Sequence, residues 1–194
     1  MTISTQAIQQ LRQATGVGIM DAKKALQEAE GDHDKAMEIL RKQGHDKAQK
    51  RAERATESGI IDTYLHMGKI GAMVMVECET DFVARTDEFQ HFAHDIAMHV
   101  AAAEPQYISP DDVPDSVIEQ EKSVYAEEVQ DKPEHIQEQV ISGKLDKFYE
   151  QVCLYKQPFI KDGEKTIETY LAEQIAQTGE NIRITDFSRM ELGA

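Results

Sequence analysis

The stretch IIDTYLHMGKIGAMVMVECE, residues 60–79, contains two runs of strand-like sequence joined by a short turn segment. In the second run, apolar side chains at every other position alternate with residues of mixed character. Successive side chains of a strand point to opposite faces of a sheet, so this alternation indicates a strand with one buried face. Met67-Gly68-Lys69 has the composition of a tight turn. The stretch therefore predicts a β-hairpin.

Helical patterns precede the hairpin, and together they give an α+β fold class. Three short helices are predicted within residues 1–50, where glycines interrupt the apolar pattern. The segment 15–18 separates the first two helices, and Gly44 ends the third. A charged helical linker, residues 45–58, connects this three-helix module to an α+β core, which we place at residues 51–194.

The core is predicted to pack helices against a small antiparallel sheet. The residues from Asp87 to Ala103 carry apolar side chains at three- and four-residue steps, as an amphipathic helix does. Two acidic segments predict an antiparallel helical hairpin at about 115–152. A further amphipathic helix runs from Thr166 to Gln177, and the last piece, from Asn181 to Leu192, has strand spacing. We expect this strand to join the sheet of the hairpin.

Charge and composition restrict the possible functions. The chain has 194 residues and a formal net charge of −15, which argues against direct nucleic-acid binding because phosphates are neutralised by lysine and arginine. A locally basic segment, residues 41–54, is interpreted as a solvated helix, with a basic contact stripe as the alternative. We expect no secretory signal, because the first residues lack a basic stretch followed by an apolar run, and no apolar run reaches membrane-spanning length. Cys78 and Cys153 lack metal-type spacing, which favours a reducing, cytoplasmic location.

A metal site on the long helix is the first chemical hypothesis. His91, Asp95 and His99 are four residues apart, so they share one face of the predicted helix, and such a set can bind a divalent metal. The simpler interpretation is that they form the polar edge of a helix whose opposite side is buried. No HExxH motif, cysteine pair, phosphate-binding loop or nucleophile motif accompanies them. We therefore expect no enzyme activity, no metal and no cofactor.

Residues 80–85, Thr-Asp-Phe-Val-Ala-Arg, form the most informative short segment. A phenylalanine directly follows an acidic residue at the end of a buried strand. Residue types alone favour a helix start, in which Thr80 or Asp81 caps the helix and Phe82 packs beneath it as a hydrophobic staple. A functional role for the ring is the alternative that residue types leave open.

Two segments, residues 11–26 and residues 80–85, carry a resemblance to a known family. They are similar to bacterial elongation factor Ts, the guanine-nucleotide exchange factor that promotes GDP release from elongation factor Tu during translation. The resemblance covers essentially the whole chain. Further similarity lies in the shorter segments 97–102, 157–162 and 179–182.

The resemblance implies both a fold and a contact surface. The N-terminal module would be similar to ubiquitin-associated domains, and the core would be α+β. Asp81 and Phe82 would form a tip that inserts between helices of the GTPase, near its nucleotide and Mg²⁺ site. The residues that the resemblance places at the contact with elongation factor Tu are Thr80, Asp81, Phe82, Val83, Ala84, Arg85, Ile19, Met20, Lys23 and His99.

The chain is similar to the short members of the family, which have one core subdomain and act as homodimers. A homodimer is therefore expected, with Met73, Met75 and their neighbours on the partner-facing surface of the sheet. The alternative function is a generic protein-interaction adaptor, whose N-terminal module binds another helical or ubiquitin-like partner. Such an adaptor would not need the segment 80–85.

Overall fold

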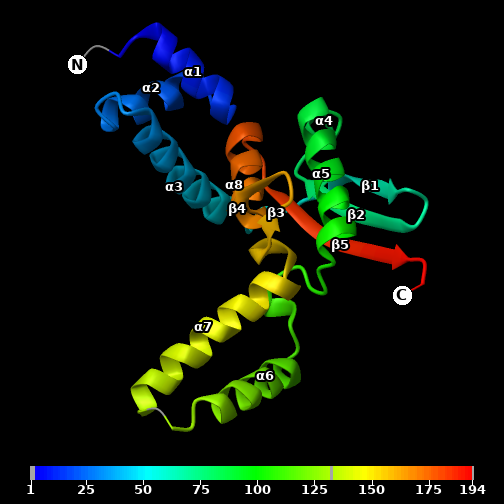
Figure 1. Ribbon diagram of the computed structural model, residues 1–194. Helices are drawn as coiled ribbons and strands as arrows, with labels where there is room; N and C mark the ends of the chain where they lie inside the picture. The colour runs from blue at the N-terminus through cyan, green and yellow to red at the C-terminus, as the bar shows by residue number, and fades with distance from the viewer. Residues whose placement is uncertain (1–2, 132, 194) are drawn as a thin grey trace.

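The computed structural model describes residues 3–131 and 133–193 and has an α+β fold, as the sequence predicts (Figure 1). Its main sheet contains three antiparallel strands in the order β1-β2-β5, namely β1 (Ser58–His66), β2 (Ile70–Cys78) and β5 (Ile182–Glu191). The hairpin and the joining of the C-terminal strand to its sheet are both confirmed. On the central strand β2, alternate side chains from Ala72 to Cys78 are buried against the core.

The turn between β1 and β2 depends on two residues with positive φ. Met67 has φ 50° and Gly68 has φ 69°, and the N–H of Lys69 donates to the carbonyl of His66 over 2.9 Å. Positive φ at both central residues gives the turn a twist that matches the twist of the two strands. The turn therefore fixes the register in which Ile70 pairs with His66.

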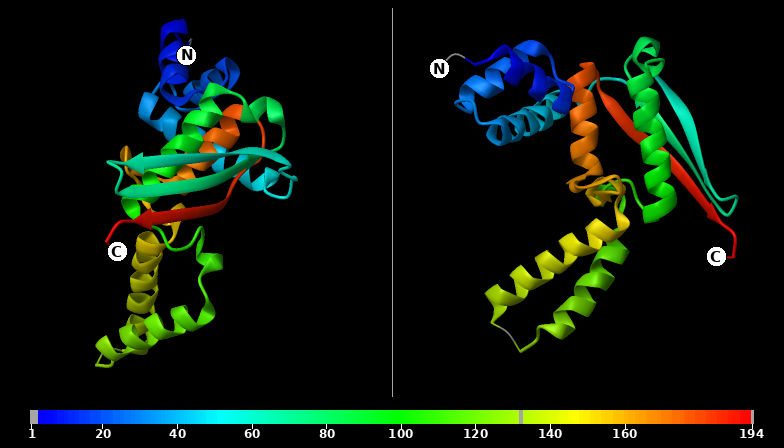
Figure 2. Two further views of the ribbon diagram at one scale, coloured as in Figure 1. Left: turned by 90° about the vertical axis from the view of Figure 1, so that its right-hand side faces the viewer. Right: turned by 45° about the horizontal axis from the view of Figure 1, so that its top comes forward.

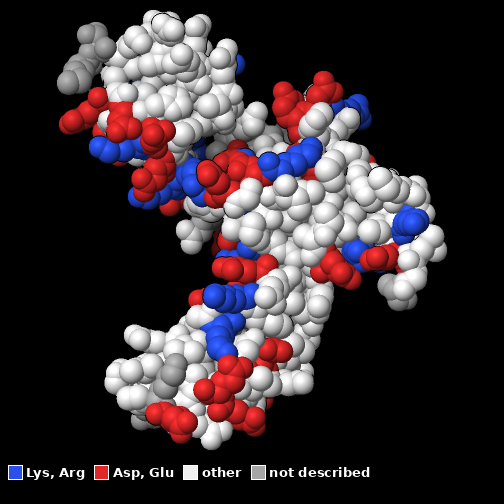
Figure 3. All heavy atoms as spheres, in the orientation of Figure 1, with Lys and Arg blue, Asp and Glu red and all other residues white. Residues whose placement is uncertain are grey.

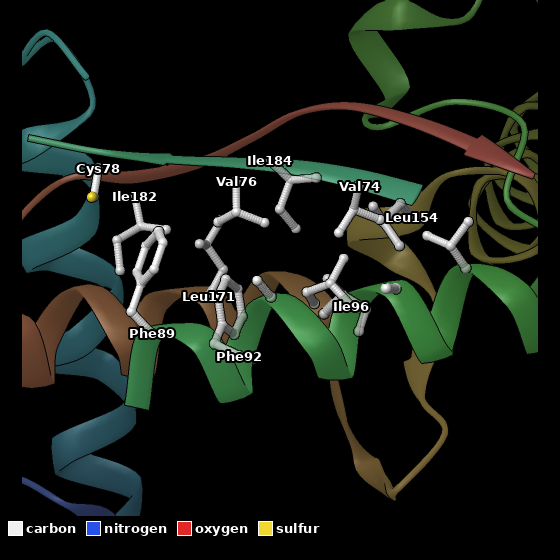
Figure 4. Close-up of a cluster of buried hydrophobic side chains, with 14 of the residues drawn as sticks. Val74, Val76, Cys78, Phe89, Phe92, Ile96, Leu154, Leu171, Ile182 and Ile184 are labelled. Carbon is white, nitrogen blue, oxygen red and sulfur yellow. The ribbon is translucent and has the colours of Figure 1, made fainter. Parts of the chain in front are cut away.

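One face of the sheet is covered by two helices, α5 (Asp87–Ala103) and α8 (Ile167–Thr178) (Figure 2). Figure 4 shows side chains of the sheet, such as Val76 and Ile184, pointing toward side chains of α5, such as Ile96. The bounds of both helices agree with the prediction to within one residue. They were predictable because an apolar stripe is a local signal, and threonines cap both helices in the structure.

The N-terminal module has a hydrophobic core of its own, in which Leu11 and Leu26 are fully buried. Its first helix ends at Gly16, which adopts the left-handed conformation with φ 69°. The carboxylate of Asp32 caps the third helix by accepting from the backbone N–H groups of Asp34 and Lys35, the second and third residues of that helix. The three helices are α1 (Thr5–Thr15), α2 (Ile19–Glu28) and α3 (His33–Arg51).

The helix α3 continues through Gly44, so the predicted helix end at this residue is wrong. Gly44 is buried against α8, where a Cβ atom at this position would lie 3.6 Å from the carbonyl oxygen of Ala172. Further along α3, Ala48 packs against the core, and Arg51 Nη1 donates to the Ile175 carbonyl over 3.2 Å. Packing of α3 on α8 therefore outweighs the low helix propensity of glycine. The helical part of the expected linker belongs to α3, and the division into two domains stays a prediction.

The predicted helical hairpin is confirmed and projects away from the main sheet (Figure 2). It comprises α6 (Asp115–Glu128) and α7 (Glu134–Val152), and Val113 and Cys153 are buried at its base. Across the described residues, no helix is both long enough and apolar enough to cross a membrane. The short elements are α4 (Asp81–Ala84), the 3₁₀ helices η1 (Pro110–Asp112) and η2 (Leu154–Lys156), and the paired strands β3 (Pro158–Phe159) and β4 (Asp162–Thr166).

Candidate functional site

The short helix α4 presents the ring of Phe82 to solvent. Phe82 is 83% exposed, so the prediction that its side chain packs beneath the helix as a staple is wrong. The predicted cap is confirmed, because the Thr80 hydroxyl accepts from the N–H of Val83 over 3.4 Å. Phenylalanine is most often buried, so a ring exposed on an anchored helix is a candidate contact for a partner.

The rest of α4 is anchored to the core, which holds in place the backbone that carries the ring. Ala84 is buried in the main hydrophobic cluster, and Val83 packs against that cluster. Behind the helix, the thiol of Cys78 donates to the carbonyl of Thr80 over 3.1 Å. One turn of helix cannot bury every side chain, and here residues 83 and 84 face inward while residue 82 faces outward. The segment therefore works as a fixed support for one aromatic ring.

Two opposite charges flank the ring. Asp81 Oδ2 and Arg85 Nη2 form an ion pair of 2.9 Å across one turn, and both side chains are exposed. An exposed pair of this kind is worth about 1 kcal/mol or less, so either partner can exchange it for a stronger contact. Figure 3 shows charged side chains of both signs gathered at this end of the core. The tip therefore combines an exposed apolar ring with two charged side chains, each of which a partner can bind in place of the ion pair.

A second exposed patch lies on the N-terminal module, at the start of α2. Ile19 is 58% exposed and Met20 is 62% exposed, and Lys23 is exposed on the next turn. The opposite face of α2 is buried through Ala22 and its neighbours, which turns these three side chains outward. In Figure 1 this module and α4 lie toward the same end of the molecule, away from the helical hairpin. The exposed residues of the predicted contact set thus form two patches, one on α4 and one on α2.

His99, like Ala84, belongs to the predicted contact set but lies in the interior. Its side chain is fully buried, with Nε2 3.0 Å from Oε1 of Gln157 and Nδ1 accepting from the N–H of Ile160 over 3.4 Å. These partners define the neutral ring with its proton on Nε2, and burial lowers the pKa of His99, against the opposing effect of the Gln157 bond. The amide of Gln157 donates in turn to the carbonyls of Ala103 and Gln151. In this conformation His99 ties α5 to the segment after α7 and has no exposed surface for a partner.

The hypothetical metal set is not brought together. The carboxylate of Asp95 is buried and accepts from Lys161 Nζ over 2.6 Å and from the Tyr170 hydroxyl over 3.1 Å, whereas His91 is exposed. Burial, together with the Asp95 charge, raises the pKa of Tyr170. No group of three or more His, Cys, Asp and Glu side chains among the described residues could hold a metal ion. The polar-edge interpretation is wrong too, since Asp95 and His99 are buried parts of separate hydrogen-bond networks.

Exposed apolar side chains at two sites on anchored helices favour a protein that acts by binding another protein. Comparison with known proteins makes this specific. A family model described as "Elongation factor TS" matches residues 5–194. The protein named elongation factor Ts of Thermotoga neapolitana is 52% identical over 194 residues, covering 100% of this chain and 98% of that protein. The elongation factor Ts of Thermodesulfovibrio yellowstonii is 48% identical over 194 residues, with the same coverage.

The chain belongs to the elongation factor Ts family. The resemblance seen in its sequence is thereby confirmed, and it extends over the described core, module and hairpin alike. The alternative of a generic adaptor is not favoured, because the family match includes the core as well as the N-terminal module.

Proposed function

We propose that this chain releases GDP from elongation factor Tu by inserting the ring of Phe82, with Asp81 beside it, near the nucleotide and Mg²⁺ site of the GTPase. The exchange function itself follows from membership of the Ts family, whose partner is elongation factor Tu. The observation that supports the insertion mechanism is the exposure of Phe82 on a helix whose neighbouring side chains are packed. A ring held in this way contacts a partner without first having to be unpacked from its own core.

The energetics require more than one patch. Nanomolar nucleotide binding is worth about 12 kcal/mol, whereas burial of one phenylalanine supplies about 1.5–3 kcal/mol. The ring alone therefore changes nucleotide affinity by about one to two decades. We assign the remaining contacts in part to Ile19, Met20 and Lys23, which the module presents separately. Coupling is reciprocal, so bound GDP weakens binding of the factor as much as the factor weakens binding of GDP.

The proposed mechanism uses binding energy and no bond chemistry, so the chain is not an enzyme in the usual sense and needs no cofactor of its own. We place its action in the bacterial cytoplasm, where its partner works. The net charge of −15 supports a protein partner rather than nucleic acid or an anionic membrane surface, since both of these attract basic proteins.

We further propose that two copies associate through the outer face of the main sheet. This face carries exposed apolar side chains from all three strands or their ends, including Ile61, Leu65, Met73 and Met190. Met75, which is partly exposed, lies on the same face of β2 as Met73. Contiguous apolar surface of this kind is a feature of protein interfaces, and a self-complementary sheet face suits a two-fold dimer.

The experiment that tests the insertion mechanism is stopped-flow release of fluorescent GDP from elongation factor Tu, over a range of factor concentrations. For Phe82→Ala, we expect the release rate at saturating factor to fall at least several-fold, because the ring contacts the GTPase only when its nucleotide site is distorted. The thermal melt should stay close to that of the wild type, since the ring is already exposed.

Met67→Ala serves as the matched control. Met67 is 85% exposed at the β1–β2 turn, so this variant removes a comparable apolar side chain far from α4. Equal release rates for Phe82→Ala and the wild type at every concentration would overturn the proposed mechanism. A large loss of stability in Phe82→Ala would instead favour the staple interpretation.

A further inference from the structure

The cap of α4 is held from the far end of the chain. The carboxylate of Glu180 accepts two hydrogen bonds from Thr80, one from its backbone N–H over 3.0 Å and one from its hydroxyl over 2.6 Å. The same hydroxyl accepts from the N–H of Val83, so Glu180 acts directly on the group that starts the helix. The two residues are 100 positions apart, in the loops before α4 and before β5.

A second carboxylate makes the reciprocal contact. Oε1 of Glu79 accepts from the backbone N–H of Asn181 over 2.6 Å and lies 3.3 Å from Arg54 Nη1. These donors hold the pKa of Glu79 below its usual value. Glu79, Thr80, Glu180 and Asn181 thus form a closed set of cross-contacts between two loops, which we call the bracket. Hydrogen bonds to a charged acceptor are about twice as strong as neutral ones, so the bracket is well suited to fix a position.

The bracket also reaches the end of α3. The side-chain amide of Asn181, which is almost fully buried, donates to the carbonyls of Arg54 over 2.8 Å and of Ala52 over 3.5 Å. Ala52 follows directly on α3, the helix that carries the N-terminal module. The same few side chains therefore contact both the start of α4, which bears Phe82, and the segment that leaves α3.

We propose that the bracket is a positioning device for nucleotide exchange, which fixes the ring of Phe82 in orientation and in its offset from the patch of Ile19 and Met20. Glu180 and Asn181 are positioning residues in this proposal, because they act through Thr80 and through the end of α3. The inference rests on the proposed role of Phe82. A factor that inserts one ring and docks a second patch on the same partner binds best when both are held at a fixed spacing, since ordering mobile groups on association costs free energy.

The test is the variant Glu180→Gln, assayed by fluorescent-GDP release over a full range of factor concentrations. The amide nitrogen that replaces one oxygen presents N–H groups to one of the two Thr80 donors and the negative charge is lost, so the cap is disturbed without loss of volume. We expect the release rate at saturation to fall about tenfold, and no further than in Phe82→Ala. Partial unfolding would act differently, because it lowers the active concentration and shifts only the concentration that gives half the maximal rate.

Glu164→Gln, in the exposed strand β4, is the control for loss of one negative charge. Its release rate at saturating factor concentration, which we call the plateau, should match that of the wild type. Thr80→Val removes the hydroxyl from the other side of the same contact, and it should lower the plateau as well. It also keeps the inference testable if Glu180→Gln fails to fold, as judged by its circular-dichroism melt.

A double variant separates this inference from the proposed function. In the Phe82→Ala background, Glu180→Gln should lower the plateau no further, because there is no ring left to position. If Phe82→Ala lowers the plateau but Glu180→Gln and Thr80→Val do not, the bracket has no positioning role and the proposed function stands. The same conclusion holds if Glu180→Gln lowers the plateau equally with and without the ring. If Phe82→Ala itself has no effect, both proposals are overturned.

Discussion

Replacement of Gly44 by alanine should stabilise the protein, although this glycine lies where α3 packs most closely on α8. The residue is helical and is not among those with positive φ, so alanine adopts its conformation without strain. A Cβ atom there would lie 3.6 Å from the Ala172 carbonyl oxygen and 3.8 Å from Ala176 Cβ, both ordinary contact distances. The substitution therefore adds contacts and removes the flexibility that glycine gives to the unfolded chain.

The magnitude follows from helix propensity. Alanine is favoured over glycine in a helix interior by about 1 kcal/mol, and small adjustments against α8 reduce this gain. We expect the free energy of unfolding to rise by about 0.5–1 kcal/mol, which raises the melting temperature by about 1–4 °C for a chain of this size. Urea unfolding followed by circular dichroism, at one protein concentration for all variants, measures the difference.

Gly16→Ala provides the matched control. Gly16 ends α1 with φ 69°, a conformation that costs alanine about 1–2 kcal/mol, so this variant should be destabilised. If Gly44→Ala lost stability as Gly16→Ala does, α3 would not run through residue 44. The helix end that the sequence predicts would then be correct, and the packing of α3 on α8 would need to be revised.

Two further predictions concern pH and assembly. Burial lowers the pKa of His99 in the folded protein, so the stability it contributes is present above about pH 6.5, the unfolded value, and is lost as pH falls through the folded pKa. Between pH 8 and pH 5, the free energy of unfolding should therefore fall less in His99→Gln than in the wild type or in the control variant His91→Gln. Equal falls in all three proteins would refute this prediction. On the outer sheet face, Leu65→Glu combined with Met190→Glu should convert a dimer into a monomer by light scattering, because buried unpaired charges oppose association. A wild-type protein that is monomeric at micromolar concentrations would contradict the proposed dimer.

Local patterns made much of the fold predictable. The alternation along β2 and the apolar stripe of α5 each depend on neighbours within a few residues, and both elements lie where the sequence predicts them. The same is true of the cap at Thr80, because threonine before a short helix is a local signal. These features need no information about the remainder of the chain.

The misses all involve contacts between distant segments. A glycine weakens a helix without necessarily ending it, and only the fold brings α8 to pack on Gly44. The contact of Glu180 with Thr80 spans 100 positions, so no spacing rule could have found it. From the sequence alone, His99 is expected on a solvated edge of α5. In the fold, the segment around Gln157 packs over this position and buries the side chain. The exposure of Phe82 likewise depends on whether a hydrophobic pocket lies beneath α4, which the sequence does not show.

The central claim is that the ring of Phe82 gains its contacts only when the nucleotide site of elongation factor Tu is distorted. The most direct test is the affinity of the factor for the GTPase with and without GDP, measured for the wild type and for Phe82→Ala. Burial of the ring is worth about 1.5–3 kcal/mol, so the factor by which GDP weakens binding should be at least about tenfold smaller in the variant. This change should arise from weaker binding to the nucleotide-free form, with similar binding to the GDP-bound form. An equal effect of GDP on both proteins would contradict the account.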